Sequence, residues 1–291
     1  MKKKKKNQLK FIDLFAGIGG FHIAFKNAGA ECVFASEWDK FARQTYEYNF
    51  KKRSPEIFET DNFAGDITKV NPKTIPDFDI LTGGFPCQPF SQAGLKKGFN
   101  ETRGALFFDI ANIMDKKRPK AFFLENVRHL LKHDNGKTFK AIKKILTKDL
   151  GYSLHAKIVK ASDFGIPQHR PRLFMIGFLD RKIDFEFPEP LTELKYTMSD
   201  IFKGACEKDV GYTLRVGGRG SNINDRRNWD SYRVNGKVVR LSEKEGLRMQ
   251  GFPQWFSFPS NISSTQAMKQ LGNSVAVPAV QAVAKELIRS V

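Results

Sequence analysis

Short apolar stretches alternate with helical patterns through most of this chain, and that alternation limits the folds open to it. We expect strands at Lys10 to Phe15, ECVFAS, DFDILTGG, Lys120 to Leu124, SLHAKIVKA and RLFMIGF. Helical patterns lie between them, from about Phe21 to Ala28, from Lys40 to Tyr48 and in GKTFKAIKKILTKDLG. Because several of the strands are continuously apolar, the pattern predicts an α/β fold whose mostly parallel sheet is covered by helices on both faces.

The pattern changes near Phe187. The following segment, up to Lys237, is rich in Gly, Asn, Asp and Arg and has weak periodicity. We interpret it as a small second domain or a large insertion. Helical patterning returns at Ser242 to Met249 and again at Thr265 to Ile288.

The composition restricts the partners and the compartment. The 291 residues include 49 Lys and Arg against 31 Asp and Glu, a formal net charge of +18, and such an excess favours a polyanionic partner. The cysteines, Cys32, Cys87 and Cys206, form no CxxC pair, which argues against a disulfide scaffold or a zinc site and for a reducing compartment. We recognise no signal peptide and no membrane-spanning stretch, so we expect a cytosolic protein.

The basic residues fall into segments of different meaning. A lysine-rich solvated surface is the plainer explanation for much of the charge, and the run Lys2 to Lys6 fits a disordered tail with weak, salt-sensitive attraction to nucleic acid. The segment Tyr212 to Arg240 is more informative, because its only acidic residues are Asp225 and Asp230. Its basic residues are Arg215, Arg219, Arg226, Arg227, Arg233, Lys237 and Arg240.

Polar and glycine-rich features follow the first predicted strands, where open parallel sheets bind ligands. The glycines of FAGIGG let the backbone approach a ligand closely. Glu37 ends the second strand about twenty residues later, where a carboxylate can bind ribose hydroxyls, and Trp38 can stack on a flat ring. Asp66 in GDI can accept from an adenine amino group. Singly, Trp38 and Asp66 fit a core aromatic residue and a turn aspartate better, but together the set predicts an adenosine site.

A cysteine and a carboxylate follow the next two predicted strands. Cys87 lies in GGFPCQPFSQAG, where prolines restrict the backbone and the loop beyond is polar; a small buried hydrophobic residue is the plainer alternative. Glu125 lies in ENV, and a carboxyl group buried there can stay protonated and donate to a ring nitrogen. Arg170 and Arg172 are two residues apart in QHRPRLF and hence on one face of a strand, where they can hold an anionic or carbonyl group and favour the thiolate.

The motifs occur in an order that resembles the DNA (cytosine-5)-methyltransferases, most closely those of bacterial restriction–modification systems. The ordered set is FIDLFAGIGGF, SEWD, GDI, GGFPCQPFS, FFLENV, HDNGKT, GIPQHRPRLFMIGF, RLSEKEGLRMQGFP and QLGNSVAVP. The resemblance implies a Rossmann-like, S-adenosylmethionine-dependent methyltransferase fold, with a catalytic domain of residues 1–186 completed by residues 262–291. A smaller target-recognition domain would then span residues 187–261.

The resemblance also implies the reaction. A methyl group passes from S-adenosyl-L-methionine to C5 of a flipped-out cytosine within a specific double-stranded DNA sequence, through a covalent Cys87–C6 intermediate, and S-adenosyl-L-homocysteine is the other product. The implied catalytic residues are Cys87, Glu125, Arg170 and Arg172. The implied cofactor contacts are Phe15, Gly17, Gly19, Glu37, Trp38, Asp66, Ile67, Asn273 and Ser274, and no metal is expected.

For DNA we expect a lid between Gln88 and Gly104 and a recognition loop between Leu214 and Tyr232. The residues expected to contact DNA are Gln88, Ser91, Lys96, Arg103, Arg215, Arg219, Arg226 and Arg227. We further expect a monomer, a place in a bacterial cytoplasm near the nucleoid, and a cognate restriction endonuclease that acts on the same DNA site.

Other functions remain as alternatives. The nearest is a tRNA cytosine-5 methyltransferase of the same fold, although the Pro-Cys-Gln motif and the glycine–arginine loop favour DNA. The other class of RNA cytosine-5 enzymes requires a second cysteine near the strand end that reads ENV here. A non-enzymatic DNA-binding relative would have little reason to keep Cys87, Glu125 and both arginines together, and an unrelated Rossmann-like protein would not carry the ordered motifs.

Overall fold

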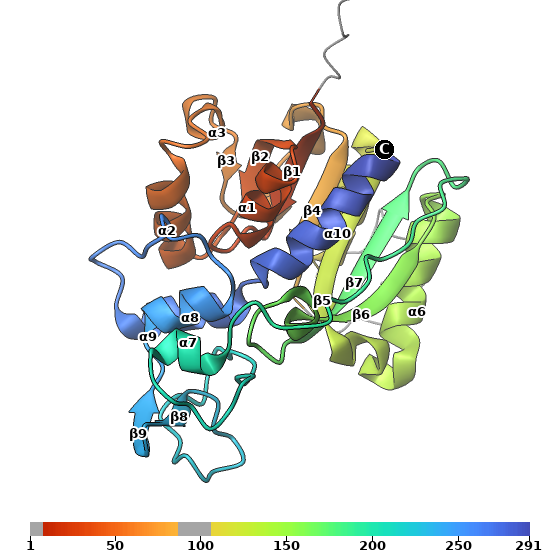
Figure 1. Ribbon diagram of the computed structural model, residues 1–291. Coiled ribbons are helices and arrows are strands. Elements are labelled where there is room, and N and C mark those ends of the chain that lie inside the picture. Colours follow the sequence, from red (N-terminus) through yellow and green to blue (C-terminus); the bar gives the residue numbers. More distant parts are fainter. Residues whose placement is uncertain (1–7, 87–105) are drawn as a thin grey trace, which may run out of the picture.

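A sheet of seven strands forms the centre of the protein (Figure 1). The computed structural model describes residues 8–86 and 106–291. The strand order is β3-β2-β1-β4-β5-β7-β6, and among the strands of these ranges β7 alone runs antiparallel to its two neighbours. The strands are β1 (Lys10–Leu14), β2 (Glu31–Ser36), β3 (Phe63–Ala64), β4 (Ile80–Gly84), β5 (Ala121–Val127), β6 (His155–Lys160) and β7 (Pro171–Phe178). The predicted mostly parallel α/β sheet is therefore confirmed.

Helices cover both faces of the sheet, as the continuously apolar strands predicted. One face carries α1 (Gly20–Asn27), α2 (Lys40–Phe50), α3 (Glu56–Glu59) and α10 (Val277–Ser290), and α1 lies beside α10 (Figure 1). The other face carries α5 (Phe107–Lys117) and α6 (Lys137–Lys144). Successive side chains of a strand enter opposite cores. Phe123 packs edge-on against Phe21 and Phe174, whereas Phe122 contacts Tyr152 on the other face.

Smaller elements lie below the sheet in Figure 1. They are α7 (Met198–Phe202), the hairpin of β8 (Ser231–Val234) and β9 (Lys237–Arg240), α8 (Glu243–Met249) and α9 (Ser264–Asn273). Single helical turns elsewhere cover Ile67–Lys69, Pro72–Thr74, Arg128–Leu131, His133–Gly136, Ile145–Asp149 and Ala161–Phe164. Much of the segment after Phe187 is irregular, in keeping with its weak periodicity, and the predicted domain boundaries at residues 187 and 261 stay predictions.

Several predicted boundaries were wrong. The strand expected to end at Leu124 continues to Val127, because it pairs along its whole length with β7, so Glu125 lies inside β5. The helical pattern from Thr265 to Ile288 is broken at Ser274, whose backbone is extended. A new helix then begins, with Pro278 in its first turn, where no backbone N–H is needed.

Candidate active site

A cavity of about 320 Å³ lies where the carboxyl ends of β1, β2, β4 and β5 meet the start of β7. The strand order changes direction between β1 and β4, which is the position where open α/β sheets bind ligands. A second cavity of about 280 Å³ shares Phe15, Glu37, Trp38 and Leu106 with the first. The two cavities therefore form neighbouring parts of one candidate site.

The glycine turn after β1 contributes one wall. Phe15 and Gly17 both have a φ of 56°, which the tight turn requires, and a Cβ atom at Gly17 would meet no atom within 4 Å. The backbone N–H of Gly17 donates to Oε2 of Glu37 at 2.8 Å, and the N–H of Asp39 donates to Oε1 at 2.8 Å. Burial raises the pKa of Glu37, while these two hydrogen bonds lower it. The Glu37 carboxylate thus fixes the turn and retains lone pairs toward the cavity.

Gly19 lies elsewhere in the turn. A Cβ atom at Gly19 would lie 2.2 Å from the ring of Phe50, and its φ of 86° favours glycine. It lines neither cavity. The structure therefore gives Gly19 a packing role beside Phe50, and the cofactor contact expected of it stays a prediction.

The second cavity contains the remaining residues expected around adenosine. Trp38 lies at the edge of this cavity and is 79% exposed, whereas Ile67 is buried and forms part of the cavity wall. Oδ1 of Asp66 accepts from the backbone N–H and the hydroxyl of Thr68, which lowers the pKa of Asp66. Asp109, in the first turn of α5, also lines this cavity; burial and then Asp66 raise its pKa. Sequence reasoning missed Asp109, because an acid in a first helical turn is common without any ligand.

Glu125 and Arg172 form an ion pair in the first cavity. Nε of Arg172 lies 2.9 Å from Oε1 of Glu125, and the two side chains are 15% and 11% exposed. Burial raises the pKa of Glu125, while Arg172 and then Arg170 lower it. Its other oxygen lies against Gly84, where a Cβ atom would be 3.4 Å away. A carboxyl group is therefore held in one orientation beside the cavity.

Arg170 and Arg172 were expected to hold one anionic or carbonyl group together, but the guanidinium of Arg170 binds the main chain. It is 2% exposed and donates to the carbonyl oxygens of Leu214 at 3.1 Å and Gly272 at 2.9 Å, and also to that of Ser274. Both arginines line the first cavity. The observed contacts of Arg170 join three chain segments, and its catalytic role stays a prediction.

The last motif divides between the cavity and the protein interior. Asn273 is exposed and lines the first cavity. Ser274 is buried, and a Cβ atom at Gly20 would lie 3.3 Å from its Oγ. Among the described residues its Oγ has no hydrogen-bond partner. Ser274 thus lies behind the glycine turn and lines neither cavity, and its cofactor contact stays a prediction.

Some predicted residues lie outside the described residues: Cys87, Gln88, Ser91, Lys96 and Arg103. The described chain reaches Pro86, which lines the first cavity. Asn126, which sequence reasoning missed, donates from Nδ2 to the carbonyl of Phe85 at 2.9 Å. The ENV motif was visible in the sequence, but this contact joins residues 41 apart and required the structure.

The predicted recognition arginines differ in how they are paired. Arg215 and Arg226 are exposed. Arg227 forms a 2.8 Å ion pair with Asp225. Arg219 donates to the carbonyl of Leu241 at 3.2 Å and to Oγ of Ser264 at 3.1 Å, and lies beside the buried Asp230. Arg215 and Arg226 are therefore exposed cations, whereas Arg227 and Arg219 are already paired with carboxylates.

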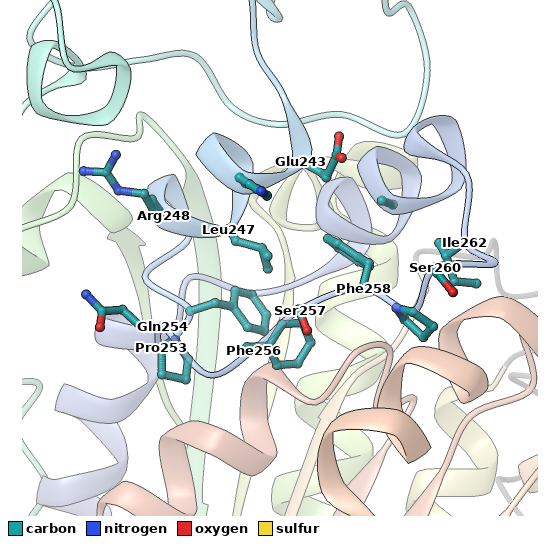
Figure 2. Close-up of a pocket in the computed structure, with 14 residues that line it drawn as sticks. Glu243, Leu247, Arg248, Pro253, Gln254, Phe256, Ser257, Phe258, Ser260 and Ile262 are labelled. Carbon is teal, nitrogen blue, oxygen red and sulfur yellow. The ribbon is translucent and has the colours of Figure 1, made fainter.

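A larger cavity of about 560 Å³ lies between α8 and the segment 252–262 (Figure 2). Figure 2 shows Leu247, Phe256 and Phe258 around it. Arg248, at its rim, already donates to the carbonyls of Ile201 at 2.7 Å and Asp200 at 2.8 Å. Because none of the described residues predicted for the reaction or the cofactor lines this cavity, we place the candidate site at the strand ends.

Two features are absent from the described ranges, 8–86 and 106–291. No group of three or more His, Cys, Asp or Glu side chains there is arranged to hold a metal ion. No helix in those ranges is both long and apolar enough to cross a membrane.

The chain is similar to known methyltransferases over nearly its whole length. The sequence model of the family described as C-5 cytosine-specific DNA methylase matches residues 9–215 and 217–289. Type II methyltransferase M.HhaI of Haemophilus parahaemolyticus is 41% identical, over 98% of this chain and 95% of that protein. Type II methyltransferase M.SsoII of Shigella sonnei is 42% identical, over 96% and 80%. The solved structure of S. pombe Dnmt2 methyltransferase has the same fold, with a TM-score of 0.73, 21% identity and coverage of 97% and 99%.

Proposed function

Because the chain belongs to the C-5 cytosine-specific DNA methylase family, we propose that Cys87, Glu125 and Arg172 carry its methyl transfer, with Arg170 in support. The protein is a DNA cytosine-5 methyltransferase, and S-adenosylmethionine is the methyl donor. The observation that carries the assignment of residues is the Glu125–Arg172 pair, which shares one cavity with Glu37 and with Pro86, the residue before Cys87.

The residues around the two cavities fit S-adenosylmethionine. Glu37 keeps acceptor capacity for ribose hydroxyls, Trp38 offers an exposed ring for stacking, and Asp66 offers a carboxylate for an amino group. Gly17 leaves room for a ligand to approach the turn. When bound, the cofactor supplies an electrophilic methyl group on a sulfonium.

Cys87 acts as the nucleophile on the target base. Its thiolate adds to C6 of cytosine, and the electrons displaced from the C5–C6 bond make C5 able to accept the methyl group. After transfer, loss of the C5 proton and departure of the thiolate restore the aromatic ring. A free thiol has a pKa of about 8.5, so a nearby positive charge would raise the share of thiolate at neutral pH.

Glu125 supports the addition step by donating a proton to N3 of the base. That role requires a protonated or proton-sharing carboxyl group, and burial raises the pKa of Glu125 in that direction. Arg172 fixes the carboxyl group and opposes part of the shift. Its other donors are suited to the cytosine carbonyl oxygen.

The enzyme acts on DNA, and we propose that the target cytosine is flipped out of the duplex to reach this buried pair. Residues 187–261 would read the sequence, with Arg215 and Arg226 as exposed cations for the phosphates or base edges. The proposal extends to a monomer in the bacterial cytoplasm near the nucleoid, with a restriction endonuclease that cuts the same unmethylated site. The Type II methyltransferases among the relatives support this setting.

The test is transfer of labelled methyl groups from S-adenosylmethionine to duplex DNA and, in parallel, to tRNA. We expect label in DNA only, and bisulfite sequencing of DNA from an expressing host should locate it at cytosines of one short motif. A Glu125→Gln variant, which keeps the side-chain shape, should transfer at least about a hundredfold more slowly. Label in tRNA alone would overturn the substrate, and an unchanged rate in Glu125→Gln would overturn the assigned residue.

A further inference from the structure

Asp230 is a fully buried carboxylate inside the segment proposed for DNA recognition. Its Oδ2 lies 3.6 Å from Nε of Arg219 and 3.5 Å from Nε of Arg240. The backbone N–H of Gly220 lies 3.1 Å from Oδ2 and 3.3 Å from Oδ1. An ionised carboxylate is stable in the interior only with compensating charges and donors. Asp230 therefore depends on this arrangement of the chain, and the arrangement depends on Asp230.

The loop above Asp230 has a backbone shape that needs such support. Gly218 and Gly220 have φ values of 78° and 89°, which residues with side chains rarely adopt. Trp229, the neighbour of Asp230, is 1% exposed and donates from Nε1 to the carbonyl of Gly217 at 2.9 Å. Trp229 and Asp230 thus hold two neighbouring parts of one loop, at Gly217 and at Gly220.

The same loop is attached to the proposed catalytic cavity. Arg170 donates to the carbonyl of Leu214, at the start of the loop, and to the carbonyl of Gly272, at the end of α9. A Cβ atom at Gly272 would lie 2.5 Å from the carbonyl carbon of Arg215, so the two backbones are in close contact. Displacement of the loop would therefore disturb a residue that lines the cavity.

Arg219 is held inward by several acceptors. Its Nε forms the 3.6 Å ion pair with Asp230, and its terminal nitrogens donate to the carbonyl of Leu241 and to Oγ of Ser264. Arg215 and Arg226 are exposed, and the described parts of the chain contain no ion pair of either. The arginines thus divide into one that shapes the loop and others that face solvent.

We propose that Asp230 is a positioning residue for DNA recognition, which fixes the loop Leu214–Gly220 in the shape that meets the duplex, with Arg219 as its internal partner. The proposal rests on the proposed function, since it requires that this loop reads DNA. It also replaces the expectation that Arg219 contacts DNA directly.

The change in DNA affinity on loss of Asp230 distinguishes a positioning role from a purely electrostatic one. DNA is a polyanion, so removal of an acidic group alone should strengthen binding to every sequence alike. Loss of a positioning residue should instead lower the ratio of the affinity for the target sequence to the affinity for other sequences. Asp225 provides the matched control, because it lies in the same segment, pairs with an exposed arginine and carries the same charge.

The experiment compares Asp230→Asn with Asp225→Asn in the full-length protein. Binding is measured to an unmethylated duplex that contains the motif found by bisulfite sequencing and to a scrambled duplex. Both measurements are made in the presence of S-adenosylhomocysteine. We expect Asp225→Asn to leave the ratio of the two affinities unchanged and Asp230→Asn to lower it about tenfold, the value of one specific contact. Equal affinity ratios in the two variants would overturn the proposal. If the wild-type enzyme methylates no DNA, the proposed function fails instead.

Loss of affinity for S-adenosylhomocysteine would show that Asp230→Asn does not fold. In that case a second variant keeps the test decisive. Arg219→Gln should lower the same affinity ratio while the salt dependence of binding stays that of the wild type, because no phosphate contact is lost. A direct phosphate contact would instead reduce the salt slope by about 1 and weaken both duplexes alike. That second outcome would contradict the internal role of Arg219.

Discussion

The side-chain amide of Asn126 donates to the main-chain carbonyl of Phe85 at 2.9 Å, and both residues are buried. This bond connects the residue after Glu125 with the residue two positions before Cys87. Oδ1 of Asn126 accepts from the N–H of Val127, so the amide is held from both sides. The two segments proposed to supply the acid and the nucleophile are therefore joined where β4 and β5 end.

Replacement of Asn126 by Asp should slow methyl transfer without weakening cofactor binding. An ionised aspartate keeps the shape of the side chain but cannot donate to Phe85, and an unsatisfied buried acceptor costs about 1–3 kcal/mol. We expect kcat to fall roughly tenfold or more, with an unchanged dissociation constant for S-adenosylhomocysteine by calorimetry. Equal losses in both quantities would indicate general destabilisation and contradict a local role.

The Glu125–Arg172 pair predicts the pH profile of the enzyme. Arg172 lowers the pKa of Glu125 against the upward effect of burial, so its loss in Arg172→Gln should raise that pKa further. Because the acid acts when protonated, kcat/KM falls as pH rises through this pKa, and the fall should move to higher pH in Arg172→Gln. Arg172→Lys keeps the charge and should keep the midpoint, although both variants lose activity. A midpoint that moves to lower pH would contradict the assignment.

The covalent mechanism predicts a trapped complex. Duplex DNA with 5-fluorocytosine at the target position has no C5 proton to lose after methylation, so the enzyme should stay bonded to it through Cys87. The adduct should require S-adenosylmethionine, survive denaturing electrophoresis and be absent from Cys87→Ser. Peptide mapping of the adduct to Cys32 or Cys206 would refute the proposed nucleophile, and a stable adduct with fluorinated tRNA alone would refute the substrate.

Glu37 should be required for cofactor binding. Glu37→Ala removes the acceptor of the Gly17 and Asp39 N–H groups and the proposed ribose contact. We expect S-adenosylmethionine and S-adenosylhomocysteine to bind more weakly by a similar factor, since the ribose is common to both, and the thermal stabilisation by either ligand to shrink accordingly. Normal binding of both ligands, measured by calorimetry, would contradict the ribose contact.

Asp13 predicts how stability depends on pH. Burial raises its pKa from 3.8 to about 8, so the folded state holds a proton that the unfolded chain releases. Its contribution to stability is complete below pH 3.8 and is lost as pH rises through about 8. Asp13→Asn, which resembles the protonated acid, should flatten this decline in urea unfolding between about pH 5 and 9. Asp77→Asn, at an exposed surface site, should retain the wild-type slope.

Much of the fold followed from local patterns. The apolar stretches placed the main strands and the helices between them because burial on both faces of a sheet demands continuous apolar sequence. The ends were harder to predict, since they depend on partners far along the chain. β5 extends beyond Glu125 to Val127 because β7 pairs with its last residues. The hairpin of β8 and β9 carries no clear alternation in its sequence.

The sequence by itself determined the family and the reaction, and it predicted the residues of the site, because the chemistry of cytosine methylation and the glycine turn allow few substitutes at these motifs. Only the tertiary structure decided which arginine side chains are bound to other groups of the protein. Arg170 and Arg172 are neighbours in sequence, yet one binds main-chain carbonyls and the other binds Glu125. Arg219 likewise lies beside the buried Asp230. Guanidinium groups are long and flexible, and the acceptors that capture them come from segments that meet only in the folded chain.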